Sequence, residues 1–117
     1  MKKELSFLQL ANASLLRDVE WMGHTPNDKD LLFNTVELAG EAGEVCNAVK
    51  KLSRTRMGIV GGKSEEESLE HLREELADVV ICAGRVAAAL NIDLGEAVVS
   101  KFNKTSDKNG LYTRLEV

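Results

Sequence analysis

Hydrophobic residues recur along most of this chain at intervals of three and four positions, which is the spacing of one face of an α-helix. Turn-forming residues interrupt the pattern, first around Pro26 and again around Gly61 and Gly62. Ser64 and Asp93 each stand three positions before a glutamate, the spacing of a capping box at a helix start. The pattern therefore predicts helices over residues 3–22, 29–54, 64–90 and 93–104, and a polar tail over residues 105–117.

The composition agrees with a small helical protein. The chain has 117 residues, of which 44% are hydrophobic, only 4% are aromatic and one is proline. Few aromatic residues and a single proline favour helix over sheet, and a chain of this length fits one domain. We therefore expect one all-α domain over residues 1–117, folded as a four-helix bundle-like subunit. A chain this short is expected to need a partner subunit to form a deep pocket.

Charge and hydropathy exclude several classes of protein. The net charge of −4 argues against binding to a nucleic-acid polymer, which would require a basic face. No segment approaches the roughly 18 consecutive apolar residues of a membrane span, and polar residues interrupt the N-terminal segment where a secretory signal would be apolar. Cys46 and Cys82 lack metal-ligand spacing and are expected to be reduced thiols. We expect a cytoplasmic protein without a membrane partner.

Two pairs of carboxylates carry the strongest chemical signal. Glu41 and Glu44 lie in the second predicted helix, and Glu75 and Asp78 lie in the third. The members of each pair are three positions apart, so they point the same way from neighbouring turns. Small residues flank the first pair and apolar residues flank the second, and carboxylates in such surroundings are costly unless paired or metal-bound. Oxygen ligands suit Mg²⁺ or Mn²⁺, so we expect metal-assisted phosphate chemistry.

Other residues could complete such a site. Glu37 continues the acidic stripe of the second helix and could be an outer ligand or an acceptor behind the ligands. Lys51 follows the first acidic pair and could neutralise phosphate groups, although cations at the end of a helix also serve as a solvated face. Trp21 could stack on a base or simply pack. The E-x-x-H motif of di-iron bundles is absent, which favours Mg²⁺ over iron.

With both acidic pairs on consecutive helices, the chain resembles the MazG-like all-α nucleoside triphosphate pyrophosphohydrolases. The resemblance covers about residues 31–108 and rests on the pattern E-x-x-E, spacer, E-x-x-D, carried by Glu41, Glu44, Glu75 and Asp78. The segment from Lys101 to Asn103 is similar to the family's C-terminal segment that contacts phosphate or base. The short chain resembles the single-domain members, many of them from phages and mobile elements.

The resemblance implies a Mg²⁺- or Mn²⁺-dependent hydrolase, with more than one ion in the substrate complex. It would convert a (d)NTP, with deoxynucleotides expected, and water into the monophosphate and pyrophosphate. Glu41 or Glu44 would orient or deprotonate the attacking water. The resemblance also implies a homodimer or homotetramer with the site at a helix interface. The expected substrate-binding residues are Glu37, Lys51, Lys101, Asn103 and Trp21.

Two alternatives remain open from the sequence. One is a phosphoribosyl-nucleotide pyrophosphohydrolase, which shares the all-α fold and the bond that is cleaved. The other is a non-enzymatic helical oligomer or regulator, in which the acidic stripe is only a solvated face. Bound metal and pyrophosphate release would exclude the regulator, and a substrate panel would separate the two enzymes.

Overall fold

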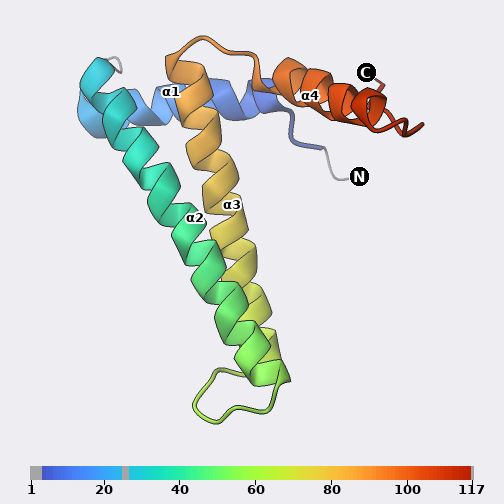
Figure 1. Ribbon diagram of the computed structural model, residues 1–117. Helices are drawn as coiled ribbons and strands as arrows, with labels where there is room; N and C mark the ends of the chain where they lie inside the picture. The colour runs from blue at the N-terminus through green and yellow to red at the C-terminus, as the bar shows by residue number, and fades with distance from the viewer. Residues whose placement is uncertain (1–3, 25–26, 117) are drawn as a thin grey trace.

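Four α-helices make up the computed structural model, which describes residues 4–24 and 27–116 (Figure 1). No strand occurs in the described residues, and the predicted all-α class is confirmed. Residue 3, the predicted start of the first helix, and residue 117, the end of the predicted tail, lie outside the described residues. The helices are α1 (Phe7–Met22), α2 (Asp28–Arg56), α3 (Glu65–Ala89) and α4 (Leu94–Lys108).

Side-chain caps fix where three of the helices begin. Ser6 and Gln9 form a reciprocal capping box, in which the Gln9 N–H donates to Ser6 Oγ (3.1 Å) and the Ser6 N–H donates to Gln9 Oε1 (2.8 Å). Because Ser6 is the cap, α1 begins at Phe7, later than the sequence pattern predicted. Ser64 and Asp93 cap α3 and α4, as their spacing predicted.

The last two helices end differently from one another. Asn91 follows α3 with a left-handed φ of 55°, as predicted for a helix stop. The fourth helix runs to Lys108, so residues 105–108, predicted as tail, are helical. The buried Ser106 explains part of this extension, because its hydroxyl donates to the carbonyl oxygen of Thr113 at 2.6 Å and folds the shortened tail back onto α4.

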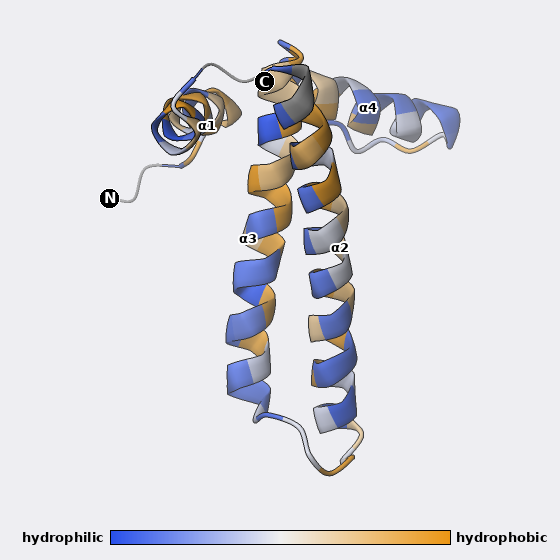
Figure 2. Cartoon of the chain, turned by 90° about the vertical axis from the view of Figure 1, so that its left-hand side faces the viewer, coloured by the Kyte–Doolittle hydropathy of each residue, from blue (hydrophilic) through white to orange (hydrophobic). Residues whose placement is uncertain are grey.

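The long helices α2 and α3 form an antiparallel hairpin joined by the glycine-containing loop. The short helix α1 crosses this hairpin near the end opposite the loop, and α4 projects away with α1 as its main packing partner (Figures 1 and 2). Apolar residues are concentrated in the half of α3 nearest α1, whereas the half nearest the loop is mostly polar (Figure 2). The predicted four-helix bundle is therefore open within one chain, because α4 does not close it.

A single copy of this fold leaves much of its surface uncovered. Its radius of gyration is 17.5 Å, against about 13 Å for a compact domain of this length. Its accessible surface is 8955 Å², against roughly 6300 Å² for a compact monomer of this mass. The difference, about 2700 Å², is at least as large as the surface that obligate dimers bury per subunit, roughly 1000–2500 Å². Leu76 and Val80 of α3 are among the large apolar side chains left exposed.

None of the described helices is both long enough and apolar enough to cross a membrane.

This open shape generates a prediction about assembly. At micromolar concentration, sedimentation equilibrium should give at least twice the 12.8 kDa mass of the chain, since a second copy would cover the exposed apolar faces. The thermal midpoint should rise with protein concentration, because dissociation and unfolding are coupled. A folded species with the mass of one chain and a midpoint independent of concentration would contradict this prediction.

Candidate metal centre and adjoining cleft

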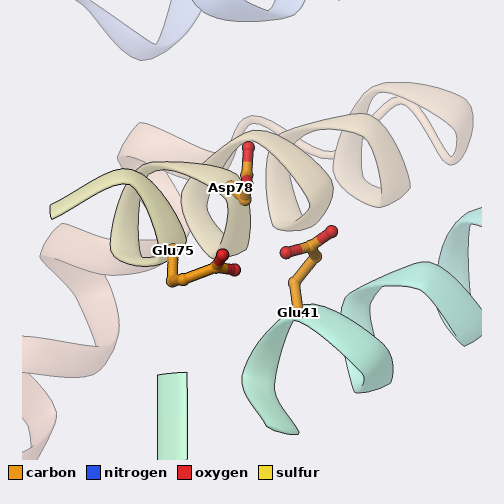
Figure 3. Close-up of side chains that lie close together, drawn as sticks. All are labelled: Glu41, Glu75 and Asp78. Atoms are coloured by element: carbon orange, nitrogen blue, oxygen red, sulfur yellow. The ribbon is translucent and has the colours of Figure 1, made fainter. Parts of the chain in front are cut away.

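Three of the four predicted carboxylate ligands meet between α2 and α3. One oxygen from each of Glu41, Glu75 and Asp78 lies within 4.8 Å of the other two. Figure 3 shows Glu41 reaching from α2 toward the two carboxylates of α3. The antiparallel hairpin causes this convergence: the spacing of three positions puts Glu75 and Asp78 on one face of α3, and α2 places Glu41 opposite them.

Glu44, the fourth predicted ligand, is exposed one turn beyond Glu41 and is not part of the close cluster. Its negative charge is nevertheless among those that raise the pKa of Glu41. Gly40 and Gly43 lie beside these carboxylates, and a Cβ added at either glycine would meet nothing within 4 Å. Packing within this chain therefore does not require glycine there, although each costs up to about 1 kcal/mol of helix propensity.

The cluster is electrostatically unfavourable without a cation. Partial burial raises the pKa of the Glu41 carboxyl, and the nearby charge of Asp78 raises it further. Glu75 adds another negative charge, and its carboxylate can accept a hydrogen bond from Glu41 once Glu41 is protonated; both also raise this pKa. Proximity of like charges and loss of solvation both favour the protonated acid. A divalent cation would reverse this balance.

One atom of the cluster independently fits a metal ligand. Glu75 Oε1 lies 3.1 Å from His71 Nε2, whereas Glu75 Oε2 is buried without any hydrogen-bond partner in the described structure. An unpaired buried carboxylate oxygen is costly, and coordination to a cation would satisfy it. The donor set consists of oxygens from carboxylates alone, which fits Mg²⁺ or Mn²⁺ better than a softer metal.

A cleft of about 590 Å³ opens beside the cluster. Glu41 and Asp78 line it where it meets the carboxylate cluster, and Trp21 and Phe33 contribute aromatic surface. The remaining lining residues are Arg17, Met22, Glu37, Ile81, Cys82 and Arg85. Among the predicted substrate-binding residues, Trp21 and Glu37 thus lie in the same cleft as two of the carboxylates. The guanidinium of Arg17 lies 5.6 Å from the centre of the Trp21 ring, a cation–π contact.

The other three predicted substrate-binding residues lie elsewhere in this chain. Lys51 follows Glu41 by ten positions, about 15 Å along the helix axis, and lines a small groove beside the glycine loop. Lys101 lies on α4, outside the cleft. The Asn103 amide donates to the carbonyl oxygen of Leu115 (3.0 Å) and accepts from its N–H (2.8 Å), so it holds the tail.

Sequence reasoning missed an ion-pair network in the wall of this cleft. Arg85 of α3 donates from Nη1 to Glu37 Oε2 at 2.7 Å and from Nε to Asp18 Oδ2 at 3.3 Å. Its Nη2 also lies 3.1 Å from Asp18 Oδ1. The signal was an arginine inside the apolar run of the third helix, matched by an aspartate in the first helix. The pairing itself becomes visible only in three dimensions.

Two comparisons with known proteins bear on the family of this chain. The model of the MazG nucleotide pyrophosphohydrolase domain matches residues 30–109. The chain is also similar to the "Gene 37 protein" of Mycobacterium phage L5, with 30% identity over 86 residues. That alignment covers 74% of this chain and 72% of the phage protein. The matched domain contains both carboxylate pairs but excludes Trp21, Asp18 and the rest of α1.

The raised pKa of Glu41 generates a prediction about stability. Because the folded state favours the protonated acid, this group's favourable contribution is present below the ordinary glutamate pKa of 4.5 and is lost as the pH rises. Glu41→Gln should therefore raise the thermal midpoint of the metal-free protein at pH 7, and the gain should shrink as the pH falls toward about 4. Thermal unfolding in excess chelator measures this difference.

The control for this measurement is Glu66→Gln, which removes a charge from an exposed position on α3 away from the cluster. Its midpoint should differ little from that of the wild type at either pH. If Glu41→Gln stabilises no more than Glu66→Gln at pH 7, or stabilises equally at both pH values, the carboxylates do not repel one another as the geometry indicates.

Proposed function

Because the chain belongs to the MazG nucleotide pyrophosphohydrolase family, we propose that it hydrolyses nucleoside triphosphates, with deoxynucleotides preferred, to the monophosphate and pyrophosphate. The observation that carries this proposal is the convergence of Glu41, Glu75 and Asp78 from two helices beside a cleft. In the reaction, a water oxygen bonds to the α-phosphorus, and the bond from that phosphorus to the α,β-bridging oxygen breaks. Pyrophosphate is the leaving group.

The three clustered carboxylates would hold Mg²⁺ or Mn²⁺, with Glu44 available when a second ion accompanies the substrate. Such ions supply charge neutralisation for the triphosphate and make a bound water more acidic. The fit rests on the oxygen-only donor set and on the unpartnered Oε2 of Glu75.

Glu41 or Glu44 is proposed to orient the attacking water and accept its proton. A general base works best when its pKa lies close to the working pH. The raised pKa of Glu41 belongs to the metal-free cluster, and a bound cation would lower it. Glu44 is the more exposed of the two and lies one turn away, outside the close cluster. In either case the accepting carboxylate must lie within hydrogen-bonding reach of the water, on the side of the cluster that opens to the cleft.

The cleft has the size and lining expected for a nucleoside. Ligand pockets commonly enclose about 300–1000 Å³, and this cleft encloses about 590 Å³. We propose that Trp21 stacks on the base, since an aromatic side chain beside a phosphate site offers a flat apolar surface for any base. In this arrangement the triphosphate lies over the carboxylates and the base lies toward α1.

Lys51 and Lys101 reach this site only if a second copy supplies them. Their positions near the loop and on α4 place them away from Glu41 in the same chain. We propose a homodimer or homotetramer in which cations of one subunit neutralise phosphates held by another. Asn103 would join them only by giving up its two bonds to Leu115.

The activity itself is the first test of this proposal. With Mg²⁺ or Mn²⁺, the purified protein should release pyrophosphate and a monophosphate from one or more dNTPs. Chromatographic separation of products identifies the bond that is cleaved, and excess chelator should abolish the reaction. Orthophosphate as the primary product, or undiminished turnover in chelator, would show that the proposed chemistry is wrong.

Substitutions at the cluster separate ligands from surface charges. Glu75→Gln and Asp78→Asn should each lower kcat/KM by about a hundredfold or more while the helical circular-dichroism spectrum stays the same, since a lost ligand removes transition-state stabilisation worth several kcal/mol. Glu66→Gln is the matched control and should retain activity within about twofold, because surface substitutions away from a site have small effects. Equal losses in all three variants at saturating metal would refute the ligand assignment.

A further inference from the structure

A buried arginine side chain joins three helices in the wall of the cleft. Arg85 projects from α3, and its side chain is only 7% exposed. It pairs with Asp18 of α1, whose side chain is 4% exposed, and with Glu37 of α2, whose side chain is 39% exposed. One guanidinium therefore connects a fully enclosed carboxylate on one side to a carboxylate that lines the cleft on the other.

Stability alone is a weak reason for such a network. Taking charges out of water costs several kcal/mol per ion, and apolar residues of similar volume often replace buried ion pairs without loss of stability. What an arginine provides is geometry, because its planar group donates in fixed directions to two carboxylates at once. The network therefore indicates that Arg85 serves to orient one of its two carboxylate partners.

The location of the network ties it to the candidate metal centre. Arg85 follows Asp78 by seven positions on α3, so both lie on one face two turns apart. Glu37 precedes Glu41 by four positions on α2 and shares its face. Asp18 precedes Trp21 by three positions on α1. Fixing these three helices at Arg85 thus fixes the metal ligands relative to the aromatic end of the cleft.

Glu37 retains unused hydrogen-bonding capacity on the cleft side. The only hydrogen bond recorded for its carboxylate in the described structure is the one from Arg85 to Oε2. A carboxylate has about four lone-pair sites, so Oε1 remains available to a ligand. Because Glu37 is negatively charged, it repels the triphosphate and favours the part of the substrate that carries N–H or O–H donors. Those donors lie on the nucleoside.

Resting on the function proposed above, we propose that Arg85 is a positioning residue that holds Glu37 as a hydrogen-bond acceptor for the nucleoside of the substrate. Glu37 then recognises a donor on the sugar or on the base, between the metal ligands and Trp21. Arg85 touches no substrate atom and acts through Glu37. Asp18 keeps the guanidinium oriented and anchors α1 over the same end of the cleft.

Binding of a substrate analogue tests the roles of Arg85 and Glu37 without depending on turnover. The probe is the α,β-imido analogue of the best dNTP, in which nitrogen replaces the oxygen of the bond to be cleaved, measured by calorimetry with Mg²⁺. Glu37→Gln keeps the size of the side chain but removes the charged acceptor, and it should raise Kd and KM about tenfold or more with kcat little changed. Arg85→Met should raise both to a similar extent, and Arg85→Lys should restore part of the loss.

A double variant separates positioning from packing. If Arg85 acts through Glu37, the combination Arg85→Met with Glu37→Gln should bind no more weakly than either single variant, since the two changes remove one interaction. The matched control is Arg73→Met, which removes an exposed arginine from the same helix, where it pairs with Glu70 at the surface. It should leave Kd and KM unchanged.

The sugar and the base are distinguished by a dideoxy probe. With the imido analogue that lacks the 3′-hydroxyl, the effect of Glu37→Gln should disappear if the donor is that hydroxyl. The effect should persist in full if the donor is on the base. Either result supports an acceptor role for Glu37 and identifies its partner.

Unchanged Kd and KM in Glu37→Gln would overturn the proposal, and so would additive effects in the double variant. Should Arg85→Met fail to fold, Arg85→Lys takes its place, alone and combined with Glu37→Gln. A wild-type protein that binds the imido nucleotide but releases no pyrophosphate from any dNTP would refute the proposed function. The Kd values of the variants would still show whether Arg85 positions Glu37. Failure of the wild type to bind any imido nucleotide would refute both.

Discussion

Two long helices hold three carboxylates close together, and the repulsion among these carboxylates dominates the physics of this structure. Glu41, Glu75 and Asp78 converge because α2 and α3 pair antiparallel along their length. The same pairing leaves one carboxylate oxygen of Glu75 buried without a partner. Folding thus concentrates negative charge that either a proton on Glu41 or a bound cation would balance. Such a cluster fits the proposed site for a hard metal ion.

The other helices and side chains surround the carboxylate cluster and form the cleft beside it. The helix α1 crosses the hairpin and adds aromatic surface, and Arg85 connects α1, α2 and α3 at the wall of the cleft. Little of the apolar surface is buried in the process, and α4 projects away from the hairpin (Figure 1). The proposed second copy would cover these apolar faces and would supply cations such as Lys51 to the site.

Local chemistry was readable from the sequence because it depends on short spacings. Residues within one helical turn of each other determine the all-α class, the caps at Ser64 and Asp93 and the stop at Asn91. The structure has each of these as predicted. The predicted start of α1 was wrong although its signal is equally local, because Ser6 and Gln9 have the spacing of a capping box that the hydrophobic pattern does not show. The predicted end of α4 was wrong because Ser106 bonds to Thr113 in the tail, a pairing that no short spacing reveals. The pairing of Asp18 with Arg85, far apart in sequence, depends on how helices cross and left no spacing to detect.

Metal binding by the isolated protein tests whether the three carboxylates form a cation site. In a titration of the metal-free protein with Mn²⁺ followed by electron paramagnetic resonance, the signal of free Mn²⁺ should be lost as the ion binds the cluster of Glu41, Glu75 and Asp78. We expect saturable binding of at least one ion per chain, greatly weakened in Glu75→Gln and retained in Glu66→Gln. Absence of binding by the wild type, or equal binding by both variants, would contradict it.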